Sequence, residues 1–245
     1  MKPLEIKHRV IGGGEPLICV PVVEQDAQSV IREITYLSQS TADMIEWRVD
    51  AFRDFTDYNA IRSVFEAVAP LLGEKLFLYT FRTAHQGGMA QVKAEQLDDL
   101  HDLAAESGCV DLVDLEFFEE DRPLHKIKRL REMGVSVIAS HHDFEQTPSP
   151  EVMKMLLEKM CAGGADIVKL AVMPQNYKDV LNLLDVTAQF REENPDTPVI
   201  TMSMGSLGGI SRISGETFGS CVTFGAHEKP SAPGQFAMKE LRQML

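Results

Sequence analysis

The chain has 245 residues, a formal net charge of −13 and a hydrophobic fraction of 44%. Such an acidic chain is not expected to bind DNA, RNA or an anionic membrane surface, because proteins that do so present basic faces. No run approaches the ~18 apolar residues of a membrane span, and residues 1–14 have no apolar segment of signal-peptide type. The four cysteines are far apart and form no CxxC pair, which predicts reduced thiols in a cytoplasmic protein.

Short β-rich segments recur along the whole chain. The first, Leu4–Val10, alternates polar and apolar residues, precedes three glycines and is expected to form a hairpin. Eight further segments are predicted as strands, mostly about 20–35 residues apart. They are Leu17–Val22, Met44–Val49, Leu76–Phe81, Leu112–Leu115, Val135–Ser140, Ile167–Ala171, Val199–Met202 and Cys221–Phe224.

Helical patterns occupy the intervals between these strands. One helix is expected to begin after Ser149, a capping residue that precedes a proline, and to end at Gly163. Val152, Leu156 and Met160 are expected on its apolar face. Another helix is expected to begin at Asn176 and to carry Val180, Leu181 and Leu184 on its apolar face.

Eight strand–helix units in a chain of this length predict one α/β domain, a (β/α)8 TIM barrel over residues 1–245. The N-terminal hairpin is expected to close the bottom of the barrel. A doubly wound open sheet is the structural alternative. It would require a glycine-rich turn after the first strand, and residues 20–23 (VPVV) provide none.

Charged side chains fall on the inward faces of several predicted strands. Alternate residues of a strand point to the same side, so in the second strand the charges lie opposite Trp47 and its apolar neighbours. Burying unpaired charge is unfavourable, so these groups must pair with each other or meet a ligand. The residues with this pattern are Glu46, Arg48, Asp50, Arg82, Asp114, Glu116 and His142.

Lys169 lies inside the apolar segment Ile167–Ala171. A lysine in such a strand is rare unless it is paired or catalytic. One interpretation is a buried salt bridge to Glu46 or Glu116. The other is an amine that forms a Schiff base with a ketone. The gathering of charges at strand C-terminal ends, where barrels carry their active sites, favours the catalytic interpretation.

Three arginines and one histidine complete the candidate chemistry. Arg48, Arg82 and Arg212 are candidate cations that would lower the pKa of the lysine and grip a small carboxylate substrate. His141 and His142 are adjacent and point to opposite faces of a strand, so a shared metal is not favoured. Strand alternation instead favours His142 as a general acid–base group.

Two loops near the C-terminus leave alternatives open. The segment 204–209 (MGSLGG) follows the seventh strand, a common phosphate site in barrels. A class I Schiff-base aldolase acting on a small phosphorylated or carboxylated keto substrate is therefore an alternative. The segment Gly225–Gln235 is either an exposed connector or a lid that supplies Ser231 and Gln235. A binding or regulatory barrel with an inert lysine is the non-enzymatic alternative.

These motifs together resemble the type I 3-dehydroquinate dehydratases of the shikimate pathway, a family of class I Schiff-base (β/α)8 barrels. The resemblance covers nearly the whole chain, and its motifs occur in the expected order. They are EWRVD at 46–50, TFR at 80–82, SHHDF at 140–144, VKLAVMP at 168–174, MSM at 202–204, ISR at 210–212, FGS at 218–220 and SAPGQ at 231–235.

The resemblance implies a role for each candidate residue. Lys169 would form an imine with the C3 ketone of 3-dehydroquinate, and His142 would remove a C2 proton and then protonate the departing C1 hydroxyl. This syn elimination of water gives 3-dehydroshikimate, needs no metal or other cofactor, and is expected in a homodimer. Substrate contacts are implied for Glu46, Arg48, Arg82, Arg212, Ser231 and Gln235, with Met202 and Phe224 as apolar walls.

The sequence departs from some family members at two positions. Gln86 stands where many members have a glutamate that orients the catalytic histidine and supplies a negative charge. A glutamine can still hydrogen-bond the imidazole, but it cannot stabilise imidazolium by charge, so we expect a less elevated histidine pKa. Pro21 stands where some members have a serine, which removes a hydroxyl contact to substrate.

Overall fold

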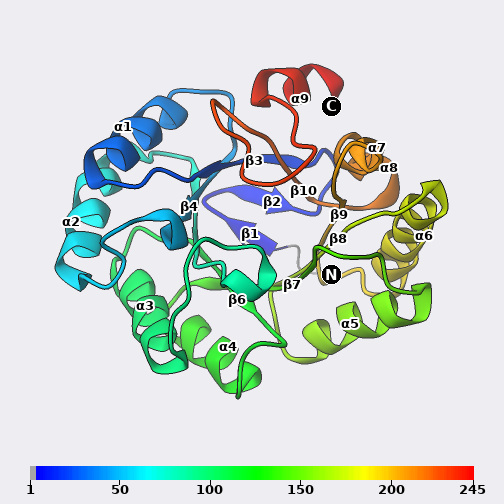
Figure 1. The fold of residues 1–245 in the computed structure, drawn as a ribbon, viewed down its shortest axis with the longest axis horizontal. Coiled ribbons are helices and arrows are strands. Elements are labelled where there is room, and N and C mark those ends of the chain that lie inside the picture. The colour runs from blue at the N-terminus through cyan, green and yellow to red at the C-terminus, as the bar shows by residue number, and fades with distance from the viewer. Residues whose placement is uncertain (1–3) are drawn as a thin grey trace.

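The computed structural model describes residues 4–245; the first three residues of the predicted 1–245 domain lie outside the described residues. Eight parallel strands form a barrel that helices surround, so the predicted TIM barrel is confirmed (Figure 1). The barrel strands are β3 (Leu17–Val22), β4 (Met44–Arg48), β5 (Leu76–Thr80), β6 (Leu112–Glu116), β7 (Ser136–Asp143), β8 (Ile167–Val172), β9 (Val199–Ser203) and β10 (Val222–Phe224).

The strands pair in the order β10-β3-β4-β5-β6-β7-β8-β9. Between β9 and β10 the ladder is replaced by an isolated bridge from Val199 to Ser220. Across this seam the Cys221 amide donates to the Val199 carbonyl at 2.8 Å, and the Thr201 amide donates to the Ser220 hydroxyl at 3.0 Å. The barrel is therefore nearly closed, with a side chain completing part of the seam.

The helices form the outer ring, and α5 and α6 begin where the sequence predicts. Asn176 caps α6 by accepting from the amides of Lys178 and Asp179, and a proline opens α5 after Ser149. The helices are α1 (Ala27–Ser38), α2 (Tyr58–Val68), α3 (Ala94–Glu106), α4 (Pro123–Glu132), α5 (Pro150–Ala162), α6 (Tyr177–Glu193), α7 (Gly209–Ile213), α8 (Gly215–Phe218) and α9 (Met238–Met244), with 3-10 turns η1 (Val49–Ala51), η2 (Ala69–Leu71) and η3 (Ala84–Gln86).

The predicted apolar faces of α5 and α6 were each wrong at one position. Val152 is 41% exposed and Leu181 is 65% exposed, whereas Met153 and Leu183 are fully buried. A rotation of one residue moves a helical side chain by about 100°, so packing against the barrel decides the face. None of the helices formed by residues 4–245 is long and apolar enough to cross a membrane.

The N-terminal hairpin closes the bottom of the barrel, as predicted. It consists of β1 (Leu4–Ile6) and β2 (Arg9–Ile11), which pair antiparallel and lie inside the ring of strands in Figure 1. Ile11 belongs to an apolar cluster inside the barrel, against which Leu4 and Ile6 pack. The strand residues in this apolar cluster include Leu76, Leu112, Ile138, Ile167 and Ile200. Apolar packing thus fills the lower interior and leaves the charged residues near the C-terminal ends of the strands.

Candidate active site

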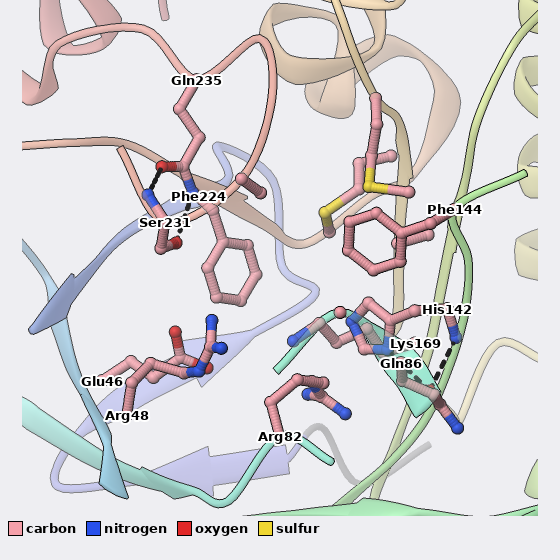
Figure 2. A pocket seen from close by; sticks show the side chains of 15 residues that line it. Glu46, Arg48, Arg82, Gln86, His142, Phe144, Lys169, Phe224, Ser231 and Gln235 are labelled. Atoms are coloured by element: carbon pink, nitrogen blue, oxygen red, sulfur yellow. Dashed lines mark hydrogen bonds between the residues drawn. The ribbon is translucent and has the colours of Figure 1, made fainter. Parts of the chain in front are cut away.

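A cavity lies at the C-terminal ends of the strands, where Figure 2 shows its side chains converging. All of the site residues predicted from sequence except Arg212 line it. The lining residues are Glu46, Arg48, Arg82, Gln86, Gly87, His142, Phe144, Lys169, Ala171, Met202, Met204, Phe224, Ser231, Ala232 and Gln235. The barrel therefore gathers residues from seven segments of the chain into one place.

Lys169 is buried in the cavity wall and pairs with Asp114. Its Nζ lies 3.0 Å from Asp114 Oδ2 and 4.4 Å above the centre of the Phe224 ring. The salt bridge of Lys169 to Glu46 or Glu116, considered from the sequence, was wrong. Glu46 instead accepts from Thr80, and Glu116 accepts from Arg82 and Thr83. Sequence periodicity placed all three carboxylates inside the barrel but could not rank their distances from the amine.

Arg82 connects Asp114 to the rest of the charge cluster. Its Nη2 lies 2.7 Å from Asp114 Oδ1, and its Nη1 lies 2.9 Å from Glu116 Oε1 and 3.1 Å from the Ser140 hydroxyl. Burial alone would raise the pKa of Asp114, but Arg82 and Lys169 outweigh that effect and hold it well below its ordinary value. Asp114 is therefore a fixed anion between two cations.

Arg48 and Glu46 extend from β4 into the other side of the cavity. Arg48 makes two 2.8 Å hydrogen bonds to Asp50, through Nε and Nη2. This two-pronged pairing fixes the plane of the guanidinium. Glu46 accepts from the Thr80 hydroxyl at 2.8 Å. Glu46 and Arg48 lie on the inward face that strand alternation predicts, whereas Asp50 lies beyond the strand in η1 and does not line the cavity.

His142 is oriented by Gln86. The backbone amide of His142 donates to Gln86 Oε1 at 2.8 Å, and His142 Nδ1 lies 2.9 Å from the same atom. Because an amide oxygen only accepts, Nδ1 carries the proton and Nε2 keeps its lone pair. Burial and the charges of Arg82 and Lys169 hold the pKa of His142 well below its ordinary value. The imidazole is thus prepared to act as a neutral base.

The segment Gly225–Gln235 reaches the cavity and is anchored beside it. The Gly205 amide and Arg212 Nη2 both donate to the Pro233 carbonyl, at 3.1 and 3.0 Å. The Ser231 amide donates to Gln235 Oε1 at 2.7 Å, and Gln235 Nε2 donates to the Ser231 hydroxyl at 3.0 Å. This geometry favours a lid over an exposed connector. The Gly205 amide, one of the donors that a phosphate site at 204–209 would use, is already paired with the lid.

Arg212 lies next to the cavity, where its side chain joins the lid to β10. It is 2% exposed and donates to the carbonyls of Phe224 and Pro233. Within residues 4–245 it has no ion pair, and its Nε has no hydrogen-bond partner. Burial lowers the pKa of Arg212 to about 10. A buried cation without an anion is favourably placed for an anionic ligand at this end of the cavity.

Some cavity residues were not among the predicted site residues. Phe144 follows His142 by two positions and its ring stacks on the imidazole, with centroids 6.4 Å apart. Met204 follows Met202 in the same way, so strand alternation could have identified both. Gly87 has φ of +81°, and a Cβ there would lie 2.4 Å from the Phe144 ring. Across residues 4–245, no three His, Cys, Asp or Glu side chains gather as metal ligands.

The chain is similar to proteins of one family over its whole length. A family model described as Type I 3-dehydroquinase matches residues 18–245. A 3-dehydroquinate dehydratase from Syntrophotalea carbinolica is 42% identical, covering 100% of this chain and 97% of the relative.

Two crystal structures show the same architecture. A type I 3-dehydroquinate dehydratase from Clostridium difficile, with covalent modified comenic acid, has a TM-score of 0.95 at 38% identity and covers 99% of this chain and 96% of its own. A 3-dehydroquinate dehydratase from Geobacillus kaustophilus has a TM-score of 0.96 at 36% identity, with 100% and 95% coverage.

Proposed function

The chain belongs to the type I 3-dehydroquinase family, and we propose on that premise that Lys169 and His142 carry its reaction. The reaction is the dehydration of 3-dehydroquinate to 3-dehydroshikimate, a hydro-lyase step of the shikimate pathway. The observation that carries the proposal is the shared cavity. A buried amine and a neutral imidazole face one space, together with fixed arginines.

Lys169 is the residue proposed to form the imine. Its Nζ gives up one ammonium proton and attacks the C3 ketone of the substrate; that proton and one from the bound amine leave with the carbonyl oxygen as water, and a protonated imine remains. That iminium withdraws electrons and acidifies the neighbouring C2–H bond. The ion pair with Asp114 at 3.0 Å supports this assignment, because the same carboxylate stabilises the positive charge of the iminium.

His142 is the residue proposed to move the proton. Nε2 takes a C2 proton and the C–H electrons form an enamine. The enamine then expels the C1 hydroxyl, which leaves as water with the proton from the same imidazole. The Gln86 contact supports this role, because it leaves Nε2 unprotonated before the first step. Hydrolysis of the product imine returns the free amine.

The arginines and the lid are proposed to hold the substrate. Arg48 and Arg82 point into the cavity with fixed guanidinium planes, and Ser231 and Gln235 reach it from the lid. Arg212 supplies a buried positive charge at the lid, which suits the substrate carboxylate. Met202 and Phe224 offer apolar walls, and Glu46 offers an acceptor for a substrate hydroxyl.

A trapping experiment tests the proposal. The protein is incubated with 3-dehydroquinate, reduced with borohydride, digested and analysed by mass spectrometry, with Lys169→Met as the matched control. We expect an adduct on Lys169 in the parent protein, none in the variant, and a rise in enone absorbance with the parent protein alone. Absence of both adduct and absorbance rise in the parent protein would refute the proposal.

We also propose that the whole chain, 1–245, acts as one domain and that the protein works as a cytoplasmic homodimer. All four cysteines are free, as expected in a reducing compartment. Large apolar side chains are exposed at Tyr177, Leu181 and Ile210, which suits a protein partner face. Light scattering at micromolar concentration should give twice the 27.3 kDa chain mass; a mass of one chain would refute the dimer.

A further inference from the structure

Asp50, a carboxylate at the top of β4, holds both ends of the loop that carries Gln86. We call residues 82–90 the Gln86 loop. Asp50 Oδ1 accepts from the Arg82 amide at 3.2 Å, and Asp50 Oδ2 accepts from the Met89 amide at 3.0 Å. The side chain of Asp50 is completely buried. One carboxylate therefore spans the entry and the exit of the loop.

The Gln86 loop is closed on itself between these two anchors. The Ala84 amide donates to the Ala90 carbonyl at 3.1 Å, and the Gly88 amide donates to the Thr83 carbonyl at 2.8 Å. A Cβ at position 88 would lie 1.8 Å from the Arg82 carbonyl oxygen, so the chain approaches itself as closely as glycine allows. In a loop this compact, a shift at either anchor moves Gln86.

The same carboxylate also fixes Arg48. Both of its oxygens accept from the guanidinium at 2.8 Å while they hold the two loop amides. Asp50 thus makes four hydrogen bonds that join a cavity arginine to the loop that orients His142. Glu116 does not duplicate this role, because it contacts Arg82 and Thr83 at the entry of the loop only.

We propose that Asp50 is a positioning residue that couples the placement of Arg48 to the orientation of His142, through the Gln86 loop. This inference rests on the proposed function. Asp50 does not line the cavity and touches no substrate; it acts through Arg48 on binding and through Gln86 on proton transfer. Two different kinetic consequences follow from one side chain.

Asp50→Asn is the direct test. The asparagine side chain has the shape of aspartate, but its NH₂ group replaces one oxygen that accepts hydrogen bonds from Arg48 and a loop amide. The substitution also removes the negative charge that pairs with Arg48. We expect KM to rise by about 10-fold from the loss of a charged hydrogen bond. We expect kcat to fall by about 10- to 100-fold from misplacement of the base. Asp111→Asn is the matched control, since Asp111 also accepts from a backbone amide and a lysine, but at the bottom of the barrel.

Met89→Pro separates the two consequences and does not depend on the stability of the Asp50 variant. Met89 is 61% exposed, and proline removes the amide N–H that donates to Asp50 and sets a ring carbon against the same oxygen, so the exit of the loop must move away from Asp50. We expect a lower kcat with an unchanged KM, because the Arg48 pair is intact. Met89→Ala keeps the amide and should behave as the parent protein. Equal kinetics for the proline and alanine variants would overturn the proposal.

The route through Gln86 is tested by imidazole 15N NMR and by a double variant. The parent protein should show His142 protonated at Nδ1, and Asp50→Asn should show a mixture of tautomers. Combined with Gln86→Ala, Asp50→Asn should lower kcat no further than Gln86→Ala alone. Fully multiplicative effects would overturn the coupling. If the parent protein itself fails to dehydrate 3-dehydroquinate, the proposed function fails instead, which keeps the two results distinct.

Discussion

The two ends of the barrel use carboxylates in different ways. At the bottom, three aspartates just before strands each accept a hydrogen bond from the amide of a neighbouring strand and pair with a basic side chain. They are Asp43 with Ile18 and Arg9, Asp111 with Phe77 and Lys7, and Asp166 with Val137 and Arg131. At the top, Asp50, Asp114 and Glu116 pair with cations beside the cavity. The lower carboxylates tie strand backbone to partly exposed cations, whereas the upper ones hold buried cavity cations and, through Asp50 and Glu116, the backbone of the Gln86 loop.

The carboxylates at the two ends of the barrel also differ in solvent exposure, which decides how much their ion pairs stabilise the fold. The side chains of Asp43, Asp111 and Asp166 are 12–14% exposed and their cations are 28–53% exposed. The side chains of Asp114 and Asp50 have no exposed surface. Buried ion pairs lose most of their Coulomb gain to desolvation, and apolar replacements are often as stable. A cluster of this kind at the cavity is therefore better explained by chemistry than by stability.

Among the variants at the upper end of the barrel, Lys169→Met should lower kcat the most. Lys169→Met keeps the length of the side chain and leaves Asp114 paired with Arg82 and Ser140. We expect kcat to fall on the order of 10³-fold or more, because the covalent route is lost. A steady-state assay of enone formation measures this. Retention of more than a tenth of the parent rate would exclude Lys169 as the imine-forming residue.

Removing His142, the proposed base, should have the next largest effect on kcat. We expect His142→Ala to lower kcat by about 10²- to 10⁴-fold, the usual contribution of a positioned acid–base group. Lys169 is untouched, so borohydride should still trap a substrate adduct on it. Mass spectrometry of the reduced variant, beside the parent protein, checks this separation. Loss of trapping together with turnover would instead assign His142 to imine formation.

Gln86→Glu tests how the charges at the upper end of the barrel set the pKa of His142. A carboxylate beside Nδ1 stabilises imidazolium and raises the pKa of His142, which burial, Arg82 and Lys169 now hold low. The base works when unprotonated, so the rate falls as pH decreases through its pKa. We therefore expect the acid limb of the pH–rate profile to move to higher pH in the variant. Coincident acid limbs for the two proteins would contradict this reasoning.

Asp111→Asn at the lower end should have the smallest effect on activity. It weakens the hydrogen bond from the Phe77 amide and the pair with Lys7, so we expect a loss of about 1–2 kcal/mol in the free energy of unfolding. Turnover should equal that of the parent protein. Urea denaturation and the enone assay measure the two quantities. A change in KM would show that the two ends of the barrel are not separable.

Much of the fold was predictable from local patterns. The strand segments and the start of α6 at Asn176 depend on alternation and capping, which act within a few residues. The apolar faces of α5 and α6 were less predictable. Val152 and Leu181 fit a helical period but point outward, because the barrel surface selects the rotation of each helix.

The sequence by itself determined which residues face the inside of the barrel, since strand alternation is a local steric property. It placed Lys169, His142, Arg48 and Arg82 on inward faces, and they do line one cavity.

Only the tertiary structure decided which groups meet. Asp114 rather than Glu46 or Glu116 pairs with Lys169, and the Pro233 carbonyl of the lid accepts from the Gly205 amide and from Arg212. These outcomes depend on distances between residues more than 20 positions apart in the chain. Strand tilt, strand register and competition for hydrogen bonds set those distances, and no local pattern encodes them.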